Sequence, residues 1–146
     1  MEYDNRQVLS VDQLSIEKGE ILAIVGPSGA GKSTLLRILN FLEPATSGEL
    51  LFDGQQLQGS VSLEVRRRVT TVFQRPQLLN RSVAANVSFG LNVRGIDTNG
   101  RIKAALDLVG LTNLADQAAN DLSGGEMQRV ALARALVIQP DVLLLD

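Results

Sequence analysis

The sequence contains no cysteine and no histidine. Without cysteine, disulfides and thiolate metal sites are excluded, and without histidine the commonest general base of enzymes is missing. Long apolar runs are missing too, because the longest, Ile21–Val25 and Val142–Leu145, are far too short to cross a bilayer. The segment Met1–Asn5 is polar and acidic, so no signal peptide is expected. We therefore expect a cytoplasmic compartment, with any membrane link made through a partner.

Excess charge of one sign is also lacking. The formal net charge is -2, which gives no reason to expect a nucleic-acid partner. With 146 residues, of which 45% are hydrophobic and 21% charged, the chain fits one ordinary globular domain with a real core.

Predicted strands alternate with predicted helices along the chain. Ile21–Val25 and Val142–Leu145 are continuous apolar runs, typical of strands buried on both faces of a parallel sheet. Two further strands are predicted at Glu49–Phe52, closed by the turn pair Asp53-Gly54, and at Val69–Phe73. Helices are predicted at Ser33–Leu42, Ser62–Arg68, Val83–Val93, Arg101–Val109 and Leu122–Ile138. The alternation predicts an α/β fold with a mostly parallel sheet.

One loop carries clear chemistry. Residues 26–33 read Gly-Pro-Ser-Gly-Ala-Gly-Lys-Ser and match G-x-x-x-x-G-K-[ST] between a predicted strand and a predicted helix. Glycines let the backbone curl until successive N–H groups surround an anion, and the following helix adds the positive end of its dipole. Lys32 can reach the β- and γ-phosphates, and the Ser33 hydroxyl can ligate Mg²⁺, which prefers hard oxygen ligands. The motif predicts a P-loop nucleotide binder and leaves kinases, GTPases and motor ATPases open.

A second helix start that could face a phosphate follows at residues 122–129, which read Leu-Ser-Gly-Gly-Glu-Met-Gln-Arg. Ser123 can cap the helix, and Gly124 and Gly125 leave the backbone of its first turn bare. One nucleotide does not need two phosphate-facing helix ends from the same molecule. It can use one from each of two molecules, so the segment favours a site shared between two subunits.

Together these motifs resemble those of the ABC ATPase family over the whole chain. The signature of that family is Leu-Ser-Gly-Gly-Gln or Leu-Ser-Gly-Gly-Glu, which Leu122–Glu126 matches. Gln74 follows a predicted strand where the family has its Q-loop glutamine. Val142–Asp146 resembles the Walker B strand, with Asp146 as its Mg²⁺-associated carboxylate. Tyr3 stands where the family places an aromatic residue that stacks on adenine.

The resemblance implies a role for each of these residues. Lys32, Gln74 and Asp146 would be catalytic, and Ser33, Gln74 and Asp146 would hold Mg²⁺. The residues that contact ATP would be Tyr3, Gly26, Pro27, Ser28, Gly29, Ala30, Gly31, Lys32, Ser33, Thr34, Ser123, Gly124 and Gly125. The last three would act on the ATP held by a second ATPase subunit in a head-to-tail homodimer.

The resemblance also implies further partners and a place in the cell. Transmembrane permease subunits would hold the ATPase on the inner face of the cell membrane, and an extracytoplasmic solute-binding protein would act indirectly. The phosphate loop and the Phe73–Val83 segment are most similar to importers of small oxyanions, including tungstate, molybdate and phosphate. Residues 1–74 would form the first part of the nucleotide-binding core, 75–121 a helical subdomain that docks on the permease, and 122–146 the signature helix and Walker B strand.

Three features of the family lie outside the 146 residues: the glutamate after the Walker B aspartate, the D-loop and the switch histidine. We therefore expect a C-terminally truncated ABC ATPase domain with an incomplete core sheet, in which Ile21–Val25 and Val142–Leu145 are either unpaired with each other or pulled together by distortion. The complete subunit is expected to be an ATPase, whereas this chain by itself is expected to be deficient in hydrolysis.

Two other functions stay open. The chain could be a non-hydrolytic ATP-binding or regulatory module. A DNA-repair or chromosome-maintenance ABC ATPase would carry long coiled-coil insertions between the phosphate loop and the signature, and the sequence has none there.

Overall fold

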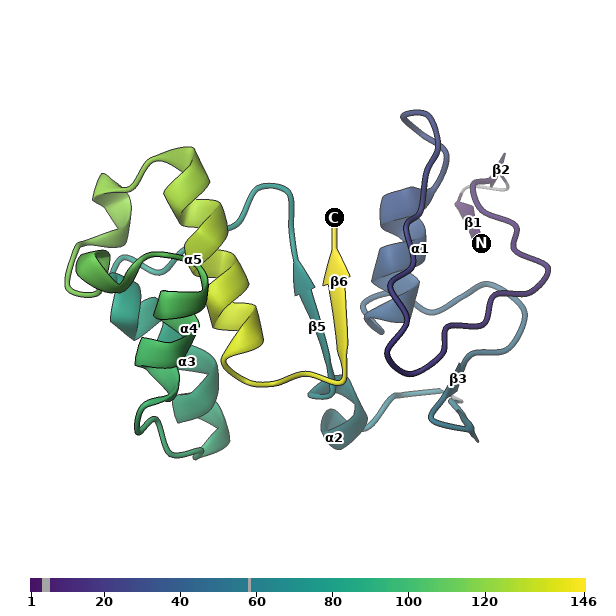
Figure 1. Cartoon of the computed structure of the whole chain (residues 1–146). Helices are drawn as coiled ribbons and strands as arrows, with labels where there is room; N and C mark the ends of the chain where they lie inside the picture. Colours follow the sequence, from purple (N-terminus) through teal and green to yellow (C-terminus); the bar gives the residue numbers. More distant parts are fainter. Residues whose placement is uncertain (4–5, 58) are drawn as a thin grey trace. The chain divides into compact units, whose positions relative to one another are not determined.

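The computed structural model describes residues 1–3, 6–57 and 59–146 of the chain. These residues form two units, 1–66 and 67–146, which are described here one after the other (Figure 1).

Helix α1 (Lys32–Leu39) is the main element of the first unit, and it buries Thr34 and Ile38. Two short antiparallel hairpins accompany it. They are β1 (Glu2–Tyr3) with β2 (Arg6–Gln7), and β3 (Leu51–Phe52) with β4 (Gln55–Gln56). The rings of Phe41 and Phe52 meet edge to face with centroids 6.0 Å apart, which ties the chain after α1 to β3. Helix α2 (Leu63–Arg66) ends the unit.

The predicted buried strand Ile21–Val25 is wrong. The segment has no strand conformation, and Ile21 and Val25 are 98% and 93% exposed. A strand of a parallel sheet exists only through the neighbours that pair with its backbone, and no described strand pairs with this run. The apolar composition of Ile21–Val25 is compatible with burial in a sheet, but strand conformation also requires neighbouring strands that pair with its backbone.

The second unit contains a parallel strand pair, β5 (Val69–Val72) and β6 (Val142–Leu145) (Figure 1). The pair is set in register where it begins, because the carbonyl of Arg68 accepts hydrogen bonds from the N–H groups of Asp141 and Val142 at 2.8 and 3.1 Å. The side chains of Arg68 and Asp141 form an ion pair at the same point. The predicted strands at these two places are confirmed, and this pair is the parallel part of the described sheet structure. The predicted burial of Val142–Leu145 on both faces is wrong, because Leu145 is 63% exposed.

Three helices cover the rest of this unit: α3 (Val83–Arg94), α4 (Arg101–Leu108) and α5 (Gly124–Leu136). Two short 3₁₀ turns, η1 (Thr112–Leu114) and η2 (Ala119–Asp121), lead from α4 to α5. The helices meet through apolar residues spaced three or four apart, which face one side of each helix. This core consists of Val83, Val87, Leu91, Ala105, Leu106, Leu111, Ala119, Leu122, Val130, Ala133 and Val137.

The helix boundaries follow local chemistry. Helix α1 ends before the predicted Leu42, because the chain turns at Phe41, whose φ is +57°. Helix α5 begins at Gly124 rather than Leu122, because Ser123 caps it. The other predicted helices begin and end within two residues of the predicted positions.

Candidate functional site

The phosphate loop at residues 26–33 is shaped by two left-handed glycines, Gly29 with φ +81° and Gly31 with φ +85°. The N–H of Ala30 donates to the carbonyl of Pro27 at 3.2 Å and closes the turn between them. A β-carbon placed on Gly31 would come within 2.9 Å of the carbonyl oxygen of Val8. Glycine is therefore required at this position both by the backbone conformation and by the close approach of another segment.

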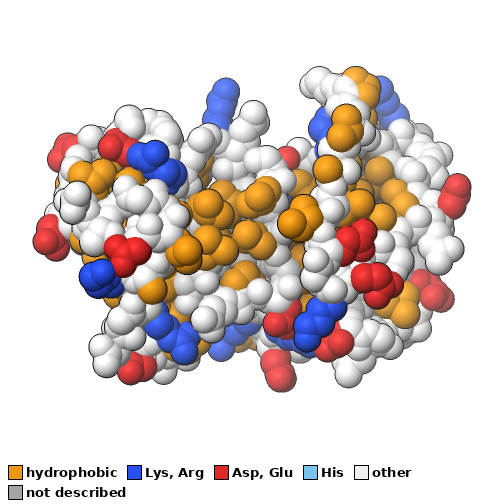
Figure 2. All heavy atoms as spheres, in the orientation of Figure 1, with side chains coloured by type: hydrophobic (Ala, Val, Ile, Leu, Met, Phe, Trp, Pro, Cys, Tyr) orange, Lys and Arg blue, Asp and Glu red, His pale blue; other side chains and the backbone are white. Residues whose placement is uncertain are grey.

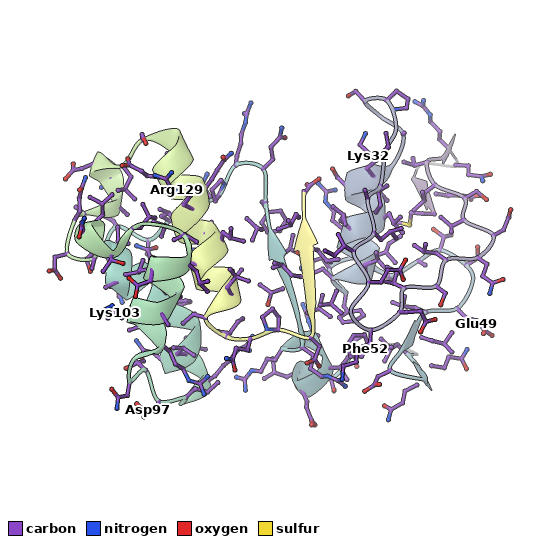
Figure 3. The ribbon with its side chains drawn as sticks, viewed as in Figure 1. Lys32, Glu49, Phe52, Asp97, Lys103 and Arg129 are labelled. Atoms are coloured by element: carbon purple, nitrogen blue, oxygen red, sulfur yellow. The ribbon has the colours of Figure 1, made fainter. Side chains whose placement is uncertain are left out.

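Lys32 is the first residue of α1, and its ammonium group turns back to the loop (Figure 3). Its Nζ donates to the carbonyls of Gly26 and Pro27, both at 2.8 Å. An ammonium has three N–H donors, so these two bonds leave one to aim at an anion. The first turn of α1 contains no acidic residue that would oppose an anion. The loop, Lys32 and the start of α1 therefore fit the phosphates of a nucleotide.

The two residues after Lys32 face different surroundings. Ser33 is exposed in the first turn of α1, where a hydroxyl can reach a metal ion bound beside phosphates, whereas Thr34 is buried against the unit. Tyr3 belongs to β1, but its side chain lies outside the described part of the structure, so its predicted stacking on adenine stays a prediction.

The second predicted phosphate-facing helix start is built as a complete capping box. The Ser123 Oγ accepts from the N–H of Glu126 at 3.4 Å, and the Glu126 carboxylate accepts from the Ser123 N–H at 2.8 Å. Gly124 and Gly125 are exposed, and no heavy atom other than the glycines' neighbours lies within 4 Å of where a β-carbon would stand. The first turn of α5 is therefore rigidly capped and open to an approaching ligand.

The Glu126 carboxylate competes with a ligand for the hydroxyl proton of Ser123. The Ser123 hydroxyl also donates to the Glu126 carboxylate, at 2.6 Å. Hydrogen bonds from the side chain and backbone of Ser123 hold the pKa of Glu126 below its ordinary value. For the Ser123 hydroxyl to donate to a phosphate instead, its proton must turn away from Glu126.

The structure brings two of the predicted residues, Gln74 and Asp146, to one edge of the parallel pair. Val72 of β5 is paired with Leu145 of β6, and the Asp146 N–H donates to the Val72 carbonyl at 3.0 Å. Gln74 comes two residues after Val72 and is exposed. The carboxyl edge of parallel strands is where α/β proteins place their ligands.

The predicted Mg²⁺ set is divided between the units. Ser33 lies in the first unit, and Gln74 and Asp146 lie in the second. Their convergence on one ion therefore stays a prediction.

Three residues near Gln74 were not found from the sequence. Gln128 and Arg134, on α5, donate to the carbonyls of Gln74 and Gln77. Asn86, which is 0% exposed, binds the backbone of Leu79. The signal for Asn86 was present, because an amide within the apolar face of Val83, Val87 and Leu91 needs buried partners. The two α5 residues are long polar side chains after the signature and carry no such signal.

Among the described residues, no helix is long and apolar enough to cross a membrane. On the face of the second unit seen in Figure 2, basic and acidic side chains are interspersed rather than gathered by sign.

The glycine loop with Lys32 at a helix start, and the second capped helix start at Ser123, define a P-loop NTPase fold of the ABC ATPase type. The family model described as "ABC transporter" matches residues 9–146, and the chain belongs to this family.

Relatives and a solved structure agree with this assignment. The chain is 43% identical over 147 residues to the tungstate uptake system ATP-binding protein TupC of Peptoclostridium acidaminophilum, covering 99% of this chain and 66% of that protein. It is 44% identical over 151 residues to the methionine import ATP-binding protein MetN of Staphylococcus haemolyticus, covering 97% of this chain and 44% of that protein. The ATP-binding cassette MJ0796, solved as a post-hydrolysis dimer bound to ADP and Pi, matches with a TM-score of 0.81 and 36% identity. That match covers 91% of this chain and 62% of that one. The chain thus spans between about half and two thirds of the length of these proteins.

Proposed function

We propose that this chain is the ATP-binding part of an ABC transporter subunit that binds Mg-ATP and couples its hydrolysis to the import of a small solute. The observation that carries the proposal is the presence of two open helix starts in one chain, at Lys32 and at Ser123. Each presents the backbone N–H groups of a first turn and the positive end of a helix dipole, which favour phosphate.

Within this function, the first unit holds the nucleotide. Lys32 neutralises charge on the β- and γ-phosphates, the loop backbone surrounds them, and Ser33 provides a hard oxygen ligand for Mg²⁺. Gln74 and Asp146, at the same edge of the β5–β6 pair, complete the metal side when the site closes. Hydrolysis then depends on positioning and on stabilising the charge of the transferred phosphoryl group.

The Ser123 helix start acts on the nucleotide of a second subunit. Ser123 and Gly125 contact the γ-phosphate held by the partner, so ATP is enclosed between two copies arranged head to tail. The open first turn of α5 supports this role, because nothing in its own unit covers Gly124 or Gly125. The dimeric, ADP- and Pi-bound state reported for MJ0796 is in keeping with such an arrangement.

The transport partners follow from the same assignment. Residues 75–121 would dock on transmembrane permease subunits, which hold the ATPase on the cytoplasmic face of the membrane and receive solute from an extracytoplasmic binding protein. The solute is proposed only as a small molecule, with an oxyanion as one candidate. Identity is 43% to the tungstate protein and 44% to the methionine protein, so the ATPase sequence does not separate these substrates.

The test is an ATP titration of the natural polypeptide that carries this sequence, comparing the parent with Lys32→Ala. Loss of a charge-assisted hydrogen bond to phosphate costs about 1.5–3 kcal/mol, which corresponds to an ATP Kd raised roughly tenfold to 150-fold. Lys18→Ala is the matched control, because Lys18 is an exposed lysine of the same unit. Equal ATP affinity of the parent and Lys32→Ala would refute the phosphate site and with it the proposed function.

A further inference from the structure

The segment from Gln74 to Leu79 is held by side chains from two helices. The Gln128 Nε2 on α5 donates to the Gln74 carbonyl at 3.4 Å, and the Arg134 Nη1 donates to the Gln77 carbonyl at 3.1 Å. At the far end, the Asn86 Oδ1 accepts from the Leu79 N–H at 2.7 Å, and its Nδ2 donates to the Leu79 carbonyl at 3.0 Å. A stretch without helix or strand conformation is thereby fixed along its length.

The spacing of these contacts shows that the segment runs alongside α5. Gln128 and Arg134 are six residues apart, which is about 9 Å along the helix axis and about 120° around it, so their long side chains reach the segment from different sides of α5. Gln74 and Gln77 are three residues apart, which is roughly 10 Å in an extended chain. Pro76 lies between them, and the residue before a proline is pushed toward extended conformation. The chain is therefore stretched enough to present carbonyls at both α5 donors.

Arg134 makes the stronger of the two α5 contacts. It is partly buried, and burial lowers the pKa of its guanidinium from the ordinary value. The group stays charged at neutral pH, so its bond to the Gln77 carbonyl is charge-assisted and less exposed to competing water. Gln128 is exposed and its bond is long, so it serves mainly to set where the segment begins.

We propose that Arg134 and Gln128 are positioning residues that fix the Gln74 segment to the helix beginning at Ser123, so that Gln74 and the Ser123 helix start move as one body. Neither residue touches nucleotide in this proposal, which rests on the proposed function for its catalytic consequence. Gln128 lies only five residues beyond Ser123, about 7.5 Å along α5. When a phosphate draws the start of α5 toward it, the Gln74 backbone is carried along, and Gln74 reaches its working position at the same step.

The mechanical part of the proposal can be measured without nucleotide. These 146 residues contain no cysteine, so within them nitroxide labels go only to Arg75→Cys and Arg129→Cys, both exposed positions. Any cysteine elsewhere in the natural polypeptide is first replaced by serine. Electron paramagnetic resonance is expected to give a narrow distance distribution in this background. Adding Arg134→Met, which keeps an apolar stem but removes the donors, should broaden it, and adding Gln128→Ala should broaden it further. Arg101→Met on α4 is the control and should leave the distribution unchanged.

The catalytic part is measured as ATP turnover of unlabelled variants. Arg134→Met should lower kcat about tenfold to hundredfold, the loss typical of a catalytic group misplaced by about 1 Å. The KM for ATP should change by less than about threefold, because the phosphate loop is not altered. Arg134→Lys should recover part of kcat, since an ammonium can still donate to the Gln77 carbonyl.

The outcomes separate the two proposals. An unchanged distance distribution in Arg134→Met, or a broadened one with unchanged kcat, overturns the positioning role. A parent protein that does not turn over ATP refutes the proposed function, while the distance measurement still decides whether α5 holds the segment. If Arg134→Met does not fold, as judged by thermal unfolding, Gln128→Ala carries the test, because it alters only an exposed side chain.

Discussion

Replacement of Asn86 should be among the most damaging single changes in the second unit. The side chain is 0% exposed, and its oxygen accepts from the Leu79 N–H at 2.7 Å. Its nitrogen lies within hydrogen-bond distance of three carbonyls, those of Leu79, Ser82 and Arg81, at 3.0, 3.0 and 3.4 Å. One buried amide thus fixes the turn that connects the Gln74 segment to α3.

The loss of folding stability in Asn86→Ala depends on which backbone groups lose a hydrogen-bond partner. The Leu79 carbonyl also accepts from the Arg81 N–H at 2.7 Å, and the Ser82 carbonyl accepts from the Asn86 backbone N–H at 3.0 Å, so both remain bonded. The Leu79 N–H loses its acceptor, at about 1–3 kcal/mol for a buried unsatisfied donor. The small cavity left by the amide adds to this, so the free energy of unfolding should fall by about 2–4 kcal/mol. That is a large share of the roughly 5–15 kcal/mol that stabilises a domain.

Asn86→Asp is a matched variant of nearly equal shape that separates hydrogen bonding from volume. It keeps the acceptor for the Leu79 N–H but turns the donor into an oxygen that faces three carbonyls. Burial and these carbonyls favour the protonated carboxyl, so its pKa in the folded state should rise above the unfolded value of about 3.9. The folded state then binds more protons than the unfolded state, and stability falls as pH rises above about 4.

The assay is urea unfolding of the parent, Asn86→Ala and Asn86→Asp in the natural polypeptide, over a range of pH. At neutral pH, Asn86→Asp should be less stable than Asn86→Ala, and the difference should shrink as the pH is lowered toward 4 (about the ordinary carboxyl pKa). A loss below about 1 kcal/mol for Asn86→Ala, or equal pH dependence of the two variants, would refute the reasoning.

Three further predictions concern the two helix starts. Gly31→Ala should destabilise the first unit more than Gly19→Ala does. Both glycines have left-handed backbones (φ +85° and +83°), but only at Gly31 would the β-carbon meet another segment, 2.9 Å from the Val8 carbonyl. Equal urea midpoints for the two variants would contradict this. Ser123→Arg should leave the ATP affinity of the monomer nearly unchanged and abolish ATP-dependent dimers, as measured by light scattering after size exclusion, and dimers that persist would argue against a site shared between copies. Glu126→Gln should remove a stabilisation that depends on pH, because hydrogen bonds from Ser123 lower the pKa of Glu126 in the folded state. The stabilisation from the Glu126 carboxylate is present above the ordinary carboxyl pKa of about 4.3 and is lost as pH falls through the folded pKa. Thermal melts of parent and Glu126→Gln should accordingly converge in acid, and a constant difference at all pH values would rule out the capping carboxylate as its source.

The helix starts show how much local sequence can predict. The predicted cap at Ser123 is confirmed, and the structure adds the reciprocal bond from the Ser123 N–H to the Glu126 carboxylate, three residues later. The helix predicted at Val83–Val93 is likewise confirmed, since α3 runs from Val83 to Arg94. These features depend on residues within one or two turns of each other, so the order of residues is enough to specify them.

The strands depend on more than local order. Val142–Leu145 and Ile21–Val25 have the same apolar character, yet only the first is a strand, because β5 lies beside it and Arg68 anchors its first residues. The Ile21–Val25 run has no such described neighbour and remains without strand conformation. Strand conformation is completed by hydrogen bonds to residues distant in sequence, which a local pattern cannot specify.

The sequence by itself determined the phosphate loop, the capped helix start at Ser123 and the family to which they belong, because each is a short pattern whose chemistry lies in adjacent residues. Only the tertiary structure decided that Gln74 and Asp146 share one sheet edge, since this requires β5 and β6 to pair in register across most of the second unit. It also decided that Gln128, Arg134 and Asn86 hold the Gln74 segment. An amide within an apolar helix face marks Asn86 as needing buried partners, but it does not say which backbone groups these are. Gln128 and Arg134 bind backbone carbonyls, groups that every residue carries and that no sequence pattern marks, so their roles appear only when packing brings each side chain to a particular stretch of chain.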